Sequence, residues 1–412
     1  MNKKILFSLC LLIFVDAIGA GLIFPIMPEL FLNSQYGLVK SNSFLSSNIL
    51  YGLSFGLFPL ASFFGMPLLG SLSDQYGRRK IMLLGLVGIC LSDLLACFSI
   101  LVRDPYIFLL SRLTMGFCSG TYIVANAVIA DLSTSVKSKM NNFRWPMLSS
   151  IAGFVLGPLI GSSSVIAKGI YSLTTPFIIV LCLSLFNLAL IYLSFRDISL
   201  DKSLEKTKTF KAQVRAIIDI FTDKSLRFLT ISYSLFQFAI GLFIQSISLF
   251  LASSFNYSTK IIGIFFTVMC LGLTLNILII QPILTKYVEV RRLIIFSIVI
   301  ISIMLLIQGL SIYIGNGVNI KAIIWVASLV LYIFMPFSNT GYMAVYSDYT
   351  DKKEQGKAMG SLGQITSLMM FIASFFIGFL VLAHEPILLI LAGILALIGA
   401  LLLYIQFLER DV

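Results

Sequence analysis

Long apolar stretches separated by short polar joints dominate the sequence. Each stretch reaches the length of about 20 residues that a helix needs to cross the apolar core of a bilayer. Twelve of them are expected, at residues 5–28, 46–69, 80–101, 105–131, 145–166, 173–195, 227–252, 260–284, 293–314, 321–346, 358–383 and 386–407. The pattern predicts an all-α membrane protein with twelve transmembrane helices.

The composition agrees with this interpretation and excludes a water-soluble fold. Hydrophobic residues make up 58% of the chain and charged residues only 11%, whereas soluble domains carry roughly 25% charged residues. All six cysteines fall inside the apolar stretches, without the paired spacing of a metal site. Neither a metal nor another cofactor is predicted.

The distribution of basic residues predicts the orientation in the membrane. Of the 29 Lys and Arg residues, 23 lie in the segments that are cytoplasmic if the N-terminus is cytoplasmic, and five lie in the joints on the other side. Cytoplasmic joints of membrane proteins are enriched in Lys and Arg, so both termini are expected in the cytoplasm. Because the basic residues form no single stripe or domain, no nucleic-acid partner is expected despite the formal charge of +11.

One long polar joint divides the chain into two halves of six spans each. The joint from Arg196 to Arg227 holds eight basic residues. The predicted domains are residues 1–195, a linker at 196–226, and 227–412. A short helix lying on the anionic inner leaflet is one interpretation of the linker, and a disordered linker is the other. The helical interpretation is based on apolar residues that recur at helical spacing: Phe210, Val214, Ile217, Ile218 and Phe221.

The two halves repeat one another at a nearly constant offset. Arg291 follows Arg78 by 213 residues, and Asp348 follows Asp131 by 217. Two signals at nearly one offset indicate duplication, an architecture in which binding sites lie near the bilayer midplane between the repeats. We therefore expect two pseudo-symmetric six-helix bundles.

The hairpin after the second span carries the most specific motif of the chain. Gly70 is expected to let two helices approach closely, Asp74 to accept hydrogen bonds from backbone donors at a neighbouring helix N-terminus, and Gly77 to turn the chain. Arg78 and Arg79 remain in the cytoplasm. Such a cluster is able to latch one conformer of a rocking transporter; an ordinary positive-inside hairpin explains only its basic residues.

The fifth span carries Gly153, Gly157 and Gly161 at steps of four, with Pro158 among them. Small residues at this spacing form a groove on one helix face. We expect a helix of the other half to pack into the groove, and Pro158 to bend the helix there. As a bare pattern, the spacing is also a common packing device.

Three charges are predicted inside the spans, where they are costly and therefore suspected of function. Asp16 lies about 16 Å from the cytoplasmic end of the first span, at 1.5 Å per residue, and is our first candidate for the proton carrier. Asp93 and Arg112 lie at matching depth in neighbouring spans. An ion pair between them would satisfy both charges, so Asp93 is read as either functional or purely structural.

Together these motifs resemble those of the major facilitator superfamily. The hairpin Gly70–Lys80 resembles its signature loop, Arg112–Gly116 its fourth-span motif, and Gly153–Gly161 its fifth-span antiporter motif. Asp16–Gly21 resembles the first span of the tetracycline-proton antiporter branch. The resemblance implies a proton-coupled exchanger of the bacterial inner membrane, with a cavity lined by spans one, four, seven and ten.

The spans of the second half carry amides and no interior acid or base. If the arrangement implied by the resemblance holds, four side chains of spans seven and ten face the cavity and are candidates for binding the cargo: Gln237, Gln245, Asn339 and Tyr342. Amides within spans also hydrogen-bond to neighbouring helices, so packing is the competing interpretation.

The expected function is secondary active transport of a small molecule, with the proton and the lipid bilayer as further partners and a monomer as the working unit. Proton-coupled efflux of drugs or amphipathic metabolites is favoured. The alternative is export or import of an endogenous anionic compound, such as a carboxylate siderophore or a nutrient, for which Arg112 is an anchor. An enzyme is not expected, because no clustered catalytic motif is found.

Overall fold

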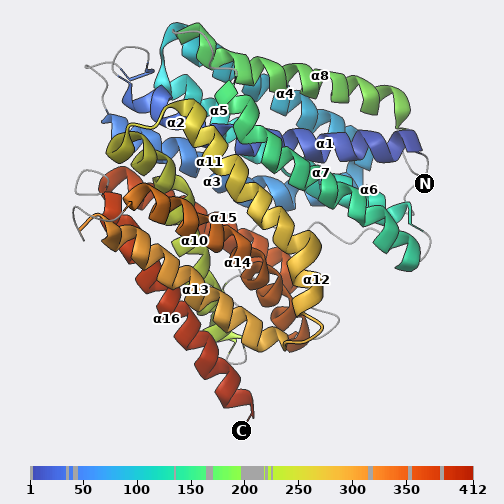
Figure 1. Cartoon of the computed structure of the whole chain (residues 1–412). Helices are drawn as coiled ribbons and strands as arrows, with labels where there is room; N and C mark the ends of the chain where they lie inside the picture. Colours follow the sequence, from blue (N-terminus) through green and yellow to red (C-terminus); the bar gives the residue numbers. More distant parts are fainter. Residues whose placement is uncertain are drawn as a thin grey trace. The chain divides into compact units, whose positions relative to one another are not determined.

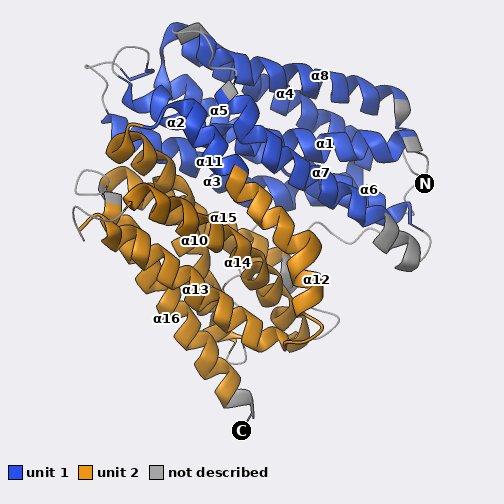
Figure 2. Ribbon diagram, viewed as in Figure 1, with its two compact units in different colours: residues 1–207, 257–267 blue, residues 208–256, 268–412 orange. Residues whose placement is uncertain are grey.

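The computed structural model describes residues 3–33, 37–39, 45–133, 136–163, 170–195, 218, 221–223, 226–313, 319–350, 355–380 and 385–411. Within them the chain is helical and contains no strand. It forms two compact units, residues 1–207 with 257–267 and residues 208–256 with 268–412 (Figure 2). The start of the eighth span thus belongs to unit 1. Most of the predicted linker, including Phe210, lies outside the described residues.

Unit 1 holds the first six spans (Figure 1). Its elements are α1 (Lys3–Gly21), α2 (Ile23–Leu32), α3 (Ser47–Tyr76), α4 (Arg78–Val102), α5 (Pro105–Cys118), α6 (Thr121–Asp131), α7 (Val136–Ser163), the 3₁₀ turn η1 (Ile170–Thr174) and α8 (Thr175–Ser194). The first span is α1 with α2, and the fourth is α5 with α6.

Unit 2 holds most of the remaining six spans. Its elements are α10 (Arg227–Phe255), α11 (Thr259–Leu275) except for the part in unit 1, the π-helical turn η2 (Asn276–Ile280), α12 (Gln281–Leu284), α13 (Val290–Ser311), α14 (Ile320–Tyr349), α15 (Gln355–Leu380) and α16 (Glu385–Asp411). The eighth span is α11, η2 and α12 together.

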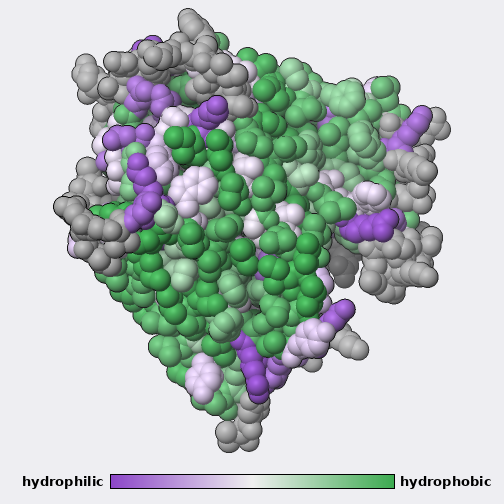
Figure 3. All heavy atoms as spheres, viewed as in Figure 1, coloured by the Kyte–Doolittle hydropathy of each residue, from purple (hydrophilic) through white to green (hydrophobic). Residues whose placement is uncertain are grey.

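Twelve helices of the described chain are long and apolar enough to cross a membrane, which confirms the predicted number of spans. The face drawn in Figure 3 is covered mainly by hydrophobic residues, as contact with lipid requires. The largest difference from the predicted boundaries is at the fifth span, whose helix begins at Val136 rather than near residue 145.

Local signals in the sequence explain where several helices begin and end. Gly77 separates α3 from α4 with a φ of 101°, which L side chains rarely adopt. Asp104 caps α5, because its Oδ1 accepts from the backbone N–H of Tyr106 at 2.8 Å, and Pro105 follows at the first helical position.

The fourth span breaks between α5 and α6 where a serine from α3 enters. The hydroxyl of Ser62 donates to the carbonyl oxygen of Gly116 at 3.0 Å and lies 2.9 Å from the hydroxyl of Ser119. A side chain that competes for helix carbonyls is a recognised cause of such breaks. The break divides the fourth span into α5 and α6.

The same helix pairings recur in both units. In unit 1 the first span packs against the fifth and sixth, the third against the fourth and sixth, and the second against the fourth. In unit 2 the seventh packs against the eleventh and twelfth, the ninth against the tenth and twelfth, and the eighth against the tenth. The halves are therefore pseudo-symmetric six-helix bundles, as the constant offset in the sequence predicts.

Candidate functional site

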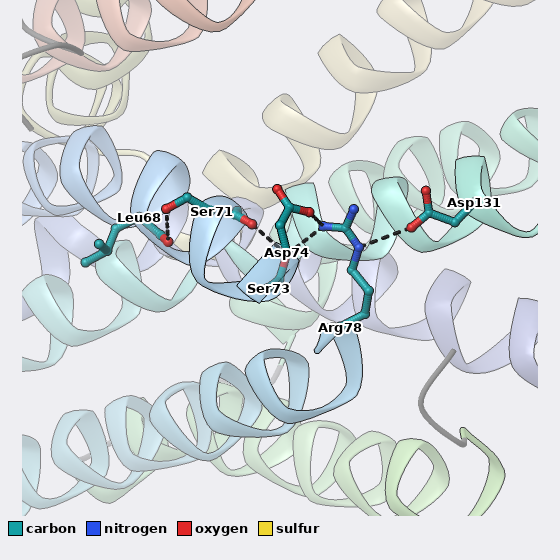
Figure 4. Close-up of polar contacts among 7 residues, drawn as sticks. Leu68, Ser71, Ser73, Asp74, Arg78 and Asp131 are labelled. Carbon is teal, nitrogen blue, oxygen red and sulfur yellow. Dashed lines mark hydrogen bonds and ion pairs between the residues drawn. The ribbon is translucent and has the colours of Figure 1, made fainter. Parts of the chain in front are cut away.

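Arg78, the first residue of α4, is the centre of the polar contacts in the hairpin (Figure 4). Its Nη1 lies 2.5 Å from Oδ1 of Asp74 and donates to the hydroxyl of Ser73 at 2.7 Å. Its Nε donates to Oδ2 of Asp131 at 3.2 Å. The arginine therefore joins α3, α4 and the end of α6 within unit 1.

Two expectations for this hairpin differ from the structure. Within the described chain, the contact of the Asp74 carboxylate is with Arg78 and not with a backbone N–H at a helix N-terminus. A Cβ added to Gly70 would lie 3.8 Å from Ile123, which is ordinary contact, so the predicted close approach at Gly70 is wrong. The tight crossing involves Gly65 instead, where a Cβ would collide with the backbone of Phe117.

Arg79 ties the same hairpin to the end of the sixth span. Its Nη2 donates to the carbonyl oxygen of Tyr192 at 2.6 Å, and its guanidinium carbon lies 5.3 Å from the centre of the Tyr192 ring. Neighbouring arginines thus contact two different helix ends. Lysine would lack the planar group that makes both kinds of contact with Tyr192.

The glycine face of α7 packs against the first span and not against the other half. Added Cβ atoms on Gly153 and Gly157 would lie 2.6 Å from the carbonyl oxygen of Phe14 and 2.9 Å from that of Ile18. A Cβ on Gly161 would meet the backbone of Leu22. The expected partner of this face was wrong, because the groove is already filled by a helix of the same bundle.

A neighbouring face of α7 contacts the start of α11, which belongs to unit 1. A Cβ added to Gly263 would collide with the side chain of Ser162, and the hydroxyl of Thr267 donates to the carbonyl oxygen of Val155 at 3.5 Å. On α7 this contact involves Ser162 and Val155, which lie beside the glycines that pack against the first span.

Asp16 lies in the C-terminal half of α1, near the middle of the first span, as a half-buried carboxylate. Its Oδ1 is buried and has no hydrogen-bond partner among the described residues. The ring of Tyr122, on α6, lies near enough for the two ionisable groups to interact electrostatically. Tyr122 was not predicted as a functional residue, although it has polar neighbours in Thr121 and Asn126 on the same helix.

Arg112 is buried in α5, and its guanidinium makes two contacts with α3. Its Nε donates to the carbonyl oxygen of Ser54 at 3.2 Å, and its guanidinium carbon lies 4.9 Å from the centre of the Phe58 ring. Both partners are on α3. The Nη groups have no hydrogen-bond partner among the described residues.

Asp93 of α4 shares a small internal cavity with Arg112. Both residues lie in the described part of the chain, and no carboxylate oxygen of Asp93 lies within 4.0 Å of a guanidinium nitrogen of Arg112. The structure therefore brings the two charges to one place without a direct ion pair. Oδ2 of Asp93 is buried without a hydrogen-bond partner in the described chain.

The predicted cargo residues of unit 2 belong to a polar network between α10, α14 and α15. Nε2 of Gln237 donates to Oδ1 of Asn339 at 3.0 Å. Gln245 uses both ends of its amide, donating to the carbonyl oxygen of Met370 at 3.2 Å and accepting from Ser374 at 2.6 Å. Tyr342 is fully buried, with its hydroxyl 2.5 Å from that of Ser232.

The network includes hydroxyl residues that were not predicted from the sequence. Tyr233 lies 2.7 Å from Thr366 of α15 through their hydroxyls, and Tyr346 donates to Thr230 at 2.6 Å. A signal for them exists, because Thr230, Tyr233 and Gln237 follow one another at steps of three and four along α10. Polar residues at helical spacing within an apolar span mark a face that contacts other helices.

Two repeated six-helix units, with buried charges in the first and a polar network in the second, define the architecture of secondary transporters built from repeats. The chain belongs to the Major Facilitator Superfamily, whose sequence profile matches residues 9–374 and 229–411. Family membership places it among membrane transporters rather than among enzymes.

The sequence relatives include antibiotic resistance proteins of bacteria. The class H tetracycline resistance protein of Pasteurella multocida is 31% identical over 241 residues, 58% of this chain and 56% of the relative. The class B protein of Escherichia coli is 33% identical over 186 residues, 44% and 42% of the two chains. Quinolone resistance protein NorA of Staphylococcus aureus is 30% identical over 162 residues, 39% and 38%. The chain spans about half the length of these curated relatives, or less.

Solved structures share the fold over nearly the whole chain. Nucleoside transporter NupG superimposes with a TM-score of 0.75 at 13% identity and covers 99% of this chain and 99% of that one. The human organic anion transporter MFSD10 (TETRAN) has a TM-score of 0.70 at 20% identity and covers 98% of this chain and 100% of that one. At these identities the likeness concerns the fold alone.

Proposed function

We propose that this chain is a proton-coupled antiporter that exports drugs or amphipathic metabolites across the bacterial inner membrane by alternating access. Both termini lie in the cytoplasm in this proposal, and a monomer is the working unit. The resistance proteins among its relatives support export of toxic compounds, and family membership supports the transport class.

The observation that carries the proposal is the carboxylate of Asp16. It lies inside a membrane-spanning helix with a buried oxygen that has no hydrogen-bond partner among the described residues. Asp93 differs, because Arg112 borders the same cavity and supplies a compensating positive charge. An uncompensated acid inside a span is a functional group by default, so Asp16 is assigned the binding and release of the proton.

The packing of α1 supports this assignment. The glycine face of α7 brings the backbones of the two helices together on either side of Asp16, from Phe14 to Leu22. A carboxylate held on a rigid helix keeps one position while a proton binds or leaves. An exchange that moves one net elementary charge across 100 mV gains about 2.3 kcal/mol, a bias on the order of fiftyfold.

Transport by purified protein in proteoliposomes, driven by an imposed pH gradient, tests the proposal with a lipophilic cation as cargo. Asp16→Asn is expected to abolish uphill transport, and Asp16→Glu to retain part of it. Glu29→Gln is the matched control, because Glu29 is an acid of the same span whose carboxylate accepts from Asn33 at 2.6 Å. Normal uphill transport by Asp16→Asn would remove Asp16 from the mechanism.

Transport of an endogenous anionic compound is the second candidate function. It is favoured by Arg112, whose Nη groups have no hydrogen-bond partner in the described chain and whose planar group binds carboxylates in pairs of hydrogen bonds. The same proteoliposomes decide between the two candidates. Acceleration by carboxylate siderophores alone, with no response to lipophilic cations, would defeat the drug-efflux proposal.

A further inference from the structure

A small cavity lies inside unit 1 between α1, α4, α5 and α8. Its volume of about 10 Å³ leaves room for about one water molecule. Asp93 and Arg112 border it, together with the hydroxyl residues Ser92 and Ser111 and the methyl group of Ala96. Two opposite charges and two hydroxyl groups thus surround a space the size of a single water.

Neither charge is satisfied by direct contact with the other. The side chains are only 5% exposed for Asp93 and 7% for Arg112, and removal of a charge from water costs several kcal/mol unless hydrogen bonds replace the lost hydration. Oδ2 of Asp93 has no donor among the described residues. A water molecule in the cavity is able to supply that donor.

The two serines cannot supply that donor. Each hydroxyl has one hydrogen, and both hydrogens are already used: Ser92 donates to the carbonyl oxygen of Ser111 at 2.9 Å, and Ser111 donates to that of Phe108 at 2.7 Å. Their oxygens are still able to accept. The cavity thus offers acceptors from Asp93 and the serines and donors from Arg112.

We propose that this cavity binds one water molecule, which bridges the Asp93 carboxylate and the Arg112 guanidinium and positions the arginine. The water accepts from Arg112, donates one hydrogen to Asp93 and directs the other to a serine oxygen. Arg112 repels a cation, Asp93 repels an anion, and the volume excludes a larger molecule. The water site is independent of transport, whereas its role in positioning Arg112 during the cycle rests on the proposed function.

Substitution of Ala96 tests the site without removing either charge. In Ala96→Val, two added methyl groups fill the cavity and expel the water without replacing its hydrogen bonds. In Ala96→Ser, an added hydroxyl takes over part of those bonds. We expect the thermal midpoint of the purified protein to fall by about 3 °C or more in Ala96→Val, and less in Ala96→Ser. An equal fall in both variants would overturn the proposal.

Combination with Asp93→Asn separates loss of the water from general overpacking. Once the water is expelled by Ala96→Val, Asp93→Asn is expected to lower the midpoint by much less than it does in the wild type, because the two changes remove one interaction. The control background is Ala125→Val, which overpacks another fully buried alanine of unit 1. There the effects are expected to add, and additive effects in both backgrounds would contradict the bridge.

An experimental structure of the wild-type protein gives the direct test, even if a variant fails to fold. Density for one water between Asp93 and Arg112 is the expected result. An empty cavity with a direct ion pair would overturn the proposal. These measurements need no transport, so a failure of proton-driven transport would remove the proposed function while leaving the water site intact.

Discussion

The guanidinium of Arg78 joins the carboxylate of Asp131 across a separation of 53 residues, with Nε and Oδ2 3.2 Å apart. The contact ties the first residue of α4 to the last residue of α6. Arg291, the counterpart in unit 2, lies over the ring of Tyr349, the last residue of α14, at 6.0 Å. In each half, an arginine of the third span thus contacts the end of the fourth span. The contact is an ion pair in unit 1 and a ring contact in unit 2.

Replacement of Arg78 is expected to loosen the cytoplasmic end of unit 1. Arg78→Ala removes charge-assisted hydrogen bonds to Asp74, Ser73 and Asp131, and we expect it to cost about 2 kcal/mol in the free energy of unfolding. Arg78→Lys keeps the charge without the planar fork and should lose about half as much. Thermal unfolding of the purified protein measures both.

Arg292→Ala is the matched control for this prediction. Arg292 is 83% exposed, and its ion pair with Glu289 spans 3.7 Å, so its removal should change stability by well under 1 kcal/mol. Equal stability of the Arg78→Ala variant and the wild type would show that the contacts in Figure 4 contribute nothing to the fold.

Gly157→Ala is expected to damage the packing of α7 on the first span. The added Cβ would lie 2.9 Å from the carbonyl oxygen of Ile18 and 3.0 Å from Cα of Gly21, and neither backbone atom is free to move aside. Overpacking of this kind costs about 1–3 kcal/mol, measured as a lower thermal midpoint. Gly363→Ala is the control, because nothing lies within 4 Å of its added Cβ. Tolerance of both substitutions would contradict the close approach.

The sequence predicts the spans well because each one must bury its backbone within hydrocarbon over a fixed length. The fourth span is predicted at 105–131, and α5 begins at Pro105 while α6 ends at Asp131. The helix of the fifth span, α7, begins at Val136, well before the apolar stretch of that span begins. Apolar length reports the part that crosses the membrane, whereas a helix can continue beyond it into water.

Partners across the fold were harder to predict than the helices themselves. The glycines of α7 do form a close-packing face, but their spacing carries no information about which helix fills it. Gly65 and Gly70 lie in the same span, yet only Gly65 lies where another backbone is close. Such choices depend on the crossing of whole helices, which no local pattern encodes.

The arginine contacts of unit 2 give a prediction of their own. The guanidinium carbon of Arg291 lies 5.5 Å from the centre of the Phe407 ring as well as over Tyr349. Arg291→Lys keeps the charge and loses the planar stacking, so the thermal midpoint should fall by a few degrees. Phe407→Leu should cause a similar fall alone and a smaller one in the Arg291→Lys background. Fully additive losses would exclude a shared contact.

Asn339 and Gln245 are expected to separate binding of cargo from helix packing in unit 2. The half-buried Asn339 accepts from Gln237, while its amide nitrogen has no hydrogen-bond partner in the described chain. Both ends of the Gln245 amide are satisfied by α15. Asn339→Ala should therefore raise the KM for cargo about tenfold, the value of one hydrogen bond of about 1.4 kcal/mol. Gln245→Leu should lower the thermal midpoint and leave KM near that of the wild type, whereas the opposite pattern would make Gln245 the cargo residue.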